Sequence, residues 1–225
     1  MNGTFYGVSV GPGEPELMTL KAVRLIKSCP VIAAPRTKDG NMLALSIAEQ
    51  VVDMTKKTVI PLDFPMKYDP AEQHENHCHI AEKLAVYVGN GQDVAMLNIG
   101  DVSLYSSCTY IAAELEKMGF ETKMCAGVPS FCAAAAELNI PLAEGSDPLT
   151  IIPAQYENVR TLIGQDGKKV IMKSGKKLSE IKEILNENAG TICVVENCGL
   201  PGQMIYRTMD ELDGCGYFTV IVADM

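Results

Sequence analysis

Residues 94–107 read Val94-Ala95-Met96-Leu97-Asn98-Ile99-Gly100-Asp101-Val102-Ser103-Leu104-Tyr105-Ser106-Ser107, an apolar run that passes directly into a Gly-Asp turn. A second stretch has the same form, because the apolar run 5–10 leads into Gly11-Pro12-Gly13 and then into the helical pattern 16–28. Glycine admits positive φ and lets a ligand approach the backbone, while proline fixes φ near about −65°. Both stretches are typical of strands that end in ligand-binding loops, and together they predict one shared cleft.

Apolar runs and amphipathic segments alternate along the whole chain. Strands are expected at 5–10, 31–34, 58–61 and 94–98, and helices at 16–28, 42–52, 71–88 and 104–118. After Gly119, which is expected to end the fourth helix, strands are expected at 121–125, 149–152, 169–172, 191–196 and 218–222, and helices at 131–138, 156–163 and 178–186. The region 141–153 is rich in Pro and Gly and predicts a loop at the edge of the second domain. The alternation indicates an α/β fold with parallel sheets covered on both faces, divided into domains 1–119 and 120–225.

Two common nucleotide-binding loops are disfavoured by the residues present. A dinucleotide-binding loop needs Gly-x-Gly-x-x-Gly and an acid about 20 residues later, but Glu16 stands at the third glycine and 31–36 holds no acid. A Walker loop needs Gly-Lys-Ser/Thr, which occurs nowhere in the chain. Nicotinamide, flavin and nucleoside triphosphate binding through these loops is therefore not expected.

The composition is that of a globular protein with an acidic balance. Apolar residues make up 47%, Trp is absent, and the formal net charge is −9. No apolar run approaches the roughly 18 residues that a membrane span needs, and the N-terminus lacks the basic and apolar regions of a signal peptide. Nucleic acid binding needs a basic face. We therefore expect a cytoplasmic protein with neither a nucleic acid nor a membrane partner.

Eight cysteines occur, none of them in a Cys-x-x-Cys motif. Most lie within expected strands or helices, which favours buried, reduced thiols over disulfides or an iron centre. Such a set of thiols suits a reducing cytoplasm.

All three histidines lie in one short segment, as His74, His77 and His79. On a helix His74, His77 and Cys78 share a face, and this spacing is suitable for zinc or cobalt. The alternative is a polar helix start. It is favoured because a structural zinc site usually has four ligands and no second Cys/His pair stands nearby, so no metal is predicted.

Five ordered blocks resemble the tetrapyrrole (corrin/porphyrin) methylases of the cobalamin pathway. They are residues 7–22, which read Gly7-Val8-Ser9-Val10-Gly11-Pro12-Gly13-Glu14-Pro15-Glu16-Leu17-Met18-Thr19-Leu20-Lys21-Ala22, and residues 127–135, 170–173, 194–197 and 217–222. Two residues depart from the family pattern: Glu14 replaces the usual Asp, and Val102 replaces the Pro of Gly-Asp-Pro. Glu14 keeps the charge, whereas Val102 removes a φ restraint and predicts a looser loop.

Within the family, residues 100–111 and 199–203 look like the branch that methylates C20 of precorrin-2. The resemblance implies two α/β domains with a ligand cleft between them, and a homodimer. It implies methyl transfer from S-adenosylmethionine to C20 of precorrin-2 or cobalt-precorrin-2 (cobalt-factor II) in cobalamin biosynthesis. The uroporphyrinogen III and C11 methylases are alternatives, diphthine synthase and a ribosomal RNA methylase are weaker ones, and a non-enzymatic S-adenosylmethionine- or tetrapyrrole-binding protein is a rival from another class.

The resemblance also implies the site residues. Those around S-adenosylmethionine are Pro12, Gly100, Asp101, Ser103, Tyr105, Ser106, Ser130, Phe131, Met172 and Cys193. Asp101 and Tyr105, with Glu196 as a further candidate, are expected to accept or relay a proton, and Asp101 can also cap the next helix. The mechanism needs no catalytic triad, since alignment and desolvation can supply much of the rate.

The substrate's carboxylates require local positive charge within an acidic chain. Gly11, Gly13 and Arg36 are expected to bind the substrate. Arg36 supplies the positive charge, and it follows a short strand at the rim where ligands bind in α/β sheets. A second basic group is either a further substrate contact or a solvated surface: Lys168, Lys169, Lys173, Lys176 and Lys177.

Overall fold

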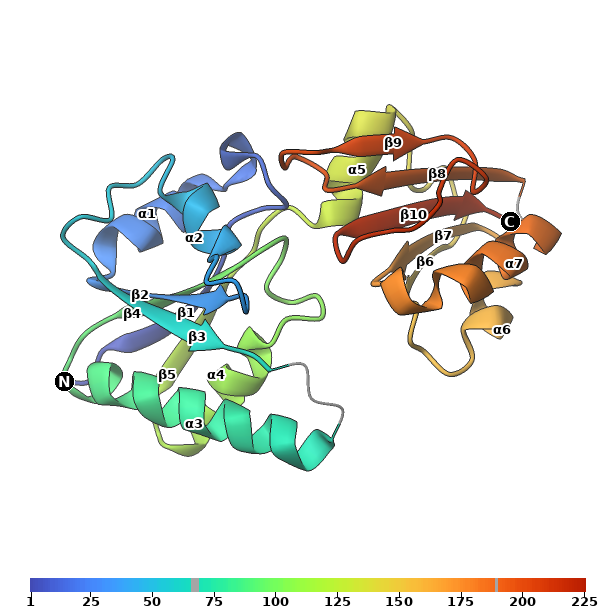
Figure 1. The fold of residues 1–225 in the computed structure, drawn as a ribbon. Coiled ribbons are helices and arrows are strands. Elements are labelled where there is room, and N and C mark those ends of the chain that lie inside the picture. The colour runs from blue at the N-terminus through green and yellow to red at the C-terminus, as the bar shows by residue number, and fades with distance from the viewer. Residues whose placement is uncertain (66–68, 189) are drawn as a thin grey trace. The chain divides into compact units, whose positions relative to one another are not determined.

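The computed structural model describes residues 1–65, 69–188 and 190–225, and the chain forms two compact units (Figure 1). The first unit is Met1–Pro129 and the second is Ser130–Met225. Within the described residues, no helix combines the length and the apolar character that a membrane span requires.

The first unit is built on a parallel sheet of five strands in the order β3-β2-β4-β1-β5. The strands are β1 (Thr4–Ser9), β2 (Val31–Arg36), β3 (Thr58–Asp63), β4 (Val94–Asn98) and β5 (Glu121–Cys125). The helices are η1 (Pro15–Leu17), α1 (Leu20–Ser28), α2 (Leu43–Ala48), α3 (Pro70–Gly89) and α4 (Cys108–Lys117). Figure 1 shows α1 and α2 on one face of this sheet and α3 and α4 on the other.

The central strands of this sheet are apolar because helices cover both of its faces (Figure 1). Every residue of β4 is buried, as expected of a parallel strand that is covered on both faces. The long helix α3 begins with Asp69 as its N-cap and Pro70 in its first turn. Ile80 and Leu84 on α3 then pack into a core that also holds Val94 from β4.

The second unit has a mixed sheet of five strands in the order β6-β7-β10-β8-β9. The strands are β6 (Leu149–Pro153), β7 (Lys168–Met172), β8 (Thr191–Glu196), β9 (Met204–Tyr206) and β10 (Thr219–Asp224). The helices are α5 (Ser130–Leu138), α6 (Val159–Ile163), η2 (Gly175–Lys177) and α7 (Leu178–Asn188). Side chains from α6 and α7 form a core with one face of the sheet, and α5 lies on the other face (Figure 1).

The structure corrects two expectations about the domains. Strand β5 pairs in parallel with β1, with Thr4 opposite Glu121, so residues 120–129 belong to the first unit and the boundary expected at 119/120 falls too early. Gly119 does end α4, with φ of 85°, but a helix end is not a domain boundary when the next strand joins the same sheet. The second sheet is mixed rather than parallel, because β10 runs antiparallel to both β7 and β8.

Several elements also differ from those expected. The expected helix 16–28 is divided, because the Thr19 side chain accepts a hydrogen bond from the Ala22 N–H and starts α1 anew. The helix expected from 104 starts only at Cys108. Strand β9 was not expected, and the predicted loop 141–153 ends where β6 begins at Leu149.

Leu84 tests the core between α3 and the first sheet. Its side chain is fully buried, so Leu84→Ala is expected to lower the free energy of unfolding by about 2–5 kcal/mol. Val86 on the same helix is 61% exposed, and Val86→Ala is expected to change it by no more than about 0.5 kcal/mol. Urea denaturation of both variants measures this difference, and equal losses would contradict the packing described.

Candidate functional site

The loops that follow β1 and β4 meet at the carboxyl edge of the first sheet. The two strands are parallel neighbours, so their carboxyl ends emerge side by side. An isolated bridge joins Gly11 to Gly100, and the Gly100 N–H donates to the Gly11 carbonyl at 2.8 Å. The Val102 N–H donates to Ser9 Oγ, also at 2.8 Å. The prediction that these two stretches converge is confirmed.

A third loop, after β5, joins them through Asp101. The Gly127 N–H donates to Asp101 Oδ2 at 2.7 Å. A Cβ atom at Gly127 would lie 2.3 Å from Ser9 Cβ and 2.7 Å from the Gly100 carbonyl oxygen, so only glycine fits this close approach. Loops from three strands therefore meet around the turn formed by Gly100, Asp101 and Val102.

Asp101 is buried and fully hydrogen-bonded. Besides Gly127, the backbone N–H of Ser103 donates to its Oδ1 at 2.8 Å, and Ser103 Oγ donates to the same oxygen. Burial raises the pKa of the Asp101 carboxyl, but the hydrogen bonds from Gly127 and Ser103 outweigh it and hold the pKa below the ordinary value. Asp101 is therefore a carboxylate at neutral pH.

Asp101 does not cap the following helix, because α4 begins seven positions later at Cys108. Its side chain instead closes a short turn onto Ser103, and the Leu104 N–H donates to the Asp101 carbonyl at 3.2 Å. The carboxylate thus shapes the loop itself.

Ser106 and Tyr105 complete this loop. Ser106 Oγ donates to Asn98 Oδ1 at 2.7 Å and accepts from the Cys108 N–H at 3.1 Å, so it links the end of β4 to the start of α4. Tyr105 has φ of 51° and is 46% exposed. A left-handed conformation costs a residue other than glycine roughly 1–3 kcal/mol, and such strain clusters at binding and catalytic sites.

The Gly-Pro-Gly bend and Arg36 lie at the same edge of the sheet. Gly11, Pro12 and Gly13 are buried, and Gly11 has φ of 75°. Arg36 is the last residue of β2, and its guanidinium binds Asp63 at the end of β3 in a bidentate pair of 3.0 and 2.8 Å. The hydrogen bond that Arg36 donates to Asp63 holds the pKa of the Asp63 carboxyl below the ordinary value. The charge expected at Arg36 is therefore largely matched by Asp63.

Four predicted residues belong to the second unit. Ser130 and Phe131 begin α5. Met172 ends β7 and lies opposite Val220 of β10, while Cys193 lies opposite Val222. Because residues two apart on a strand share a face, Met172 and Cys193 are on the same face of this sheet, two rungs apart. Met172 and Cys193 thus share a face of the second sheet, but they do not lie together at the end of a strand.

The second lysine group is mostly engaged with nearby acceptors. Lys169 is buried and its Nζ donates to the carbonyls of Asp166 and Gly167 at 2.8 Å. Lys168 Nζ donates to the Pro141 carbonyl, and Lys177 pairs with Glu180. Burial lowers the pKa of Lys173, and the side chain of Lys176 lies outside the described residues. These contacts favour a structural role for Lys168, Lys169 and Lys177.

Three residues of the loop cluster were not predicted as site residues. Ser9 and Asn98 are buried polar side chains at the ends of β1 and β4, and Gly127 follows β5. The available signal was a small or polar residue at the end of each apolar run. It is weak, because many strands end in such residues.

The chain is similar to a known protein family over most of its length. A profile described as Tetrapyrrole (Corrin/Porphyrin) Methylases matches residues 4–213. A protein of Salmonella typhimurium described as cobalt-precorrin-2 C(20)-methyltransferase is 30% identical, covering 100% of this chain and 97% of that protein. A Methanocaldococcus jannaschii protein described as a probable cobalt-precorrin-2 C(20)-methyltransferase is 36% identical, covering 92% of this chain and 89% of that protein.

A solved structure has the same fold. It is the uroporphyrin-III C-methyltransferase of Thermus thermophilus complexed with S-adenosylhomocysteine, with a TM-score of 0.70 and 19% identity over 99% of this chain and 97% of that one. The profile match and the two relatives, which are similar over nearly their full length, show that the chain belongs to the tetrapyrrole (corrin/porphyrin) methylase family.

Proposed function

We propose that this protein transfers a methyl group from S-adenosylmethionine to C20 of precorrin-2 or cobalt-precorrin-2 (cobalt-factor II) in cobalamin biosynthesis. The observation that carries the proposal is the similarity, over nearly the full chain, to two proteins described as cobalt-precorrin-2 C(20)-methyltransferases. The meeting of three loops around Gly100, Asp101 and Val102 supports a site in this part of the first unit.

The loops around Asp101 have the chemistry to hold S-adenosylmethionine. The related fold that binds S-adenosylhomocysteine supports this choice of cofactor. Bound S-adenosylmethionine supplies an electrophilic methyl group on a cationic sulfur. Gly100, Ser103, Tyr105 and Ser106 form the loop that we assign to it, with Pro12 from the neighbouring bend. From the second unit we assign Ser130, Phe131, Met172 and Cys193.

The structure suggests separate roles for Asp101 and Tyr105. Asp101 accepts hydrogen bonds from Ser103 and Gly127, and its lowered pKa makes it a weak base. We therefore assign it a positioning role, in place of the proton-accepting role that was expected from the chemistry of the reaction. Tyr105 is half exposed on a strained loop, so its phenol remains the candidate to contact the reacting ring.

Gly11, Gly13 and Arg36 are our candidates for substrate contact. The bidentate Asp63 partner orients the Arg36 guanidinium while leaving 39% of the Arg36 side chain exposed. A tetrapyrrole carboxylate can then compete with Asp63 for the guanidinium. The family resemblance further supports a cytoplasmic homodimer as the working form.

A product assay tests the function. The purified protein is incubated without oxygen with S-adenosylmethionine and either precorrin-2 or cobalt-factor II. We expect the product to gain one methyl group at C20, located by mass spectrometry and by NMR with a labelled methyl donor. Methylation at another carbon would reassign the protein within the family, and no methylation of either substrate would refute the proposal.

Asp101→Asn tests the role of the carboxylate. An amide group replaces one acceptor oxygen by a donor that faces the N–H groups of Ser103 or Gly127. We expect the free energy of unfolding to fall by about 1–3 kcal/mol and S-adenosylmethionine to bind at least about tenfold more weakly. Urea denaturation and calorimetry measure these two effects.

Asp53→Asn is the matched control for this change. Asp53 Oδ1 also accepts a backbone hydrogen bond two residues along, from the Thr55 N–H at 2.9 Å, but it is exposed. Cofactor affinity should remain at the wild-type value in this variant. An equal loss in both variants would mean that the effect of Asp101→Asn is general and not a property of the loop cluster.

The pH dependence of Asp101 has a definite sign. Its pKa is lowered in the folded protein, so its stabilising effect is present above the unfolded-state pKa of about 3.9 and is lost as the pH falls through the folded pKa. The stability difference between wild type and Asp101→Asn should be constant from about pH 8 to about pH 5 and shrink below about pH 4. Urea denaturation across this range measures it, and a difference that grows on acidification would contradict the assignment.

A further inference from the structure

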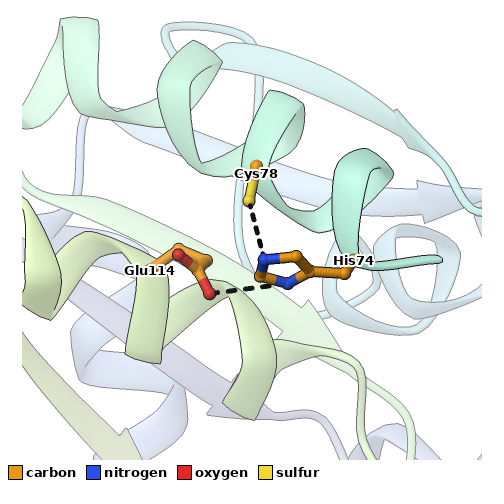
Figure 2. Close-up of side chains that lie close together, drawn as sticks. All are labelled: His74, Cys78 and Glu114. Atoms are coloured by element: carbon orange, nitrogen blue, oxygen red, sulfur yellow. Dashed lines mark hydrogen bonds and ion pairs between the residues drawn. The ribbon is translucent and has the colours of Figure 1, made fainter. Parts of the chain in front are cut away.

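Three side chains of the kinds that bind metal ions lie together between α3 and α4, on elements that the proposed methyl-transfer loops do not use. His74 and Cys78 lie one turn apart on α3, and Glu114 reaches them from α4 (Figure 2). Cys78 Sγ is 3.7 Å from His74 Nε2, and Glu114 Oε1 is 3.8 Å from His74 Nδ1. The ligand atoms of the three residues all lie within 4.8 Å of one another.

The distance between sulfur and nitrogen fits a shared ion. Zinc binds imidazole nitrogen at about 2.0–2.1 Å and thiolate sulfur at about 2.3 Å, so a tetrahedral angle puts the two ligand atoms about 3.6 Å apart. The observed separation of Cys78 Sγ and His74 Nε2 is 3.7 Å. The separation of these two atoms is therefore compatible with one shared ion.

Glu114 supplies the third group. Its side chain is only 13% exposed, and it contacts both Cys78 and His74. A carboxylate oxygen of Glu114 lies within 4.8 Å of the ligand atoms of both His74 and Cys78. The His74 side chain is 63% exposed, so the cluster opens to solvent on that side. Solvent can both deliver the ion and complete its coordination.

The charges near the cluster do not prevent binding. Lys117 Nζ lies 2.7 Å from Glu114 Oε1, but its side chain is 66% exposed and comes from the same helix, three residues on. Solvent screens the pair on the Lys117 side, so a divalent ion can displace the lysine from Glu114. A bound cation also attracts Glu114 more strongly than Lys117 does.

The ligand set differs from the one that sequence spacing offered. The His77 ring stacks on Tyr110, with centroids 5.0 Å apart and an interplanar angle of 1°, and also contacts Phe64. It packs between aromatic rings instead of joining His74 and Cys78. The exposed His79 lies near Glu75 and Glu82 on the same helix. Glu114 takes the place expected for His77.

We propose that His74, Cys78 and Glu114 bind a divalent transition-metal ion of the zinc class, with solvent as a further ligand. Thiolate and imidazole select borderline ions over Mg²⁺ and Ca²⁺, which prefer oxygen. The ion links α3 to α4 on one face of the first sheet. This site is independent of the proposed methyl transfer, so either proposal can fail without the other.

Cobalt(II) is the probe, because a Co²⁺–thiolate bond has a charge-transfer band in the near ultraviolet. The full chain is stripped with a chelator, kept reduced and free of tetrapyrrole, and titrated with Co²⁺. We expect the band to saturate at one equivalent, and Zn²⁺ to abolish it, since zinc binds such sites more tightly than cobalt. No band in the wild-type protein would overturn the proposal.

Substitutions assign the ligands. Cys78→Ser should abolish the band, and His74→Ala and Glu114→Gln should each weaken Co²⁺ binding by about tenfold or more. The controls are Cys132→Ser, which removes an exposed cysteine of the second unit, and His79→Ala, both expected to match the wild type. Circular dichroism confirms that each variant is folded. A band that survives in Cys78→Ser, or that is lost in Cys132→Ser, would overturn the assignment.

Discussion

The first unit depends on one buried carboxylate that has donors from two loops. Asp101 accepts from Ser103 within its own loop and from Gly127 after β5, while Val102 beside it donates to Ser9 at the end of β1. A buried charge is costly unless hydrogen bonds satisfy it. The three loops must therefore meet in one arrangement for the sheet edge to be stable.

The strands other than β9 and the convergence of the first two loops could be predicted from sequence, because both depend on local patterns. Strands β4, β5 and β8 have the expected bounds, and the Gly11 and Gly100 turns meet as expected. The antiparallel direction of β10 and the place of β5 in the first sheet were not predicted, and the reason is the same for both. Strand pairing is decided by contacts far apart in sequence, which hydrophobic periodicity does not report.

The same limit applies to individual site residues. Gly127 is needed because of the space left by Ser9 and Gly100, and nothing next to it in sequence shows this. The spacing of His74, His77 and Cys78 correctly predicted that they share a helix face. Which side chains they contact depends on the opposing helix α4: Tyr110 stacks on His77, and Glu114 lies near His74 and Cys78. Such choices follow from packing between elements.

Strand order in the first unit also bears on how the protein is made. Strand β1 is synthesised first, yet both of its neighbours come much later: Phe5 pairs with Val94 and with Thr122. Contacts between residues so far apart in sequence form slowly, because a long chain segment must close before they stabilise anything. The N-terminal strand thus leaves the ribosome long before its partners exist, and this sheet is completed only when residue 125 is available.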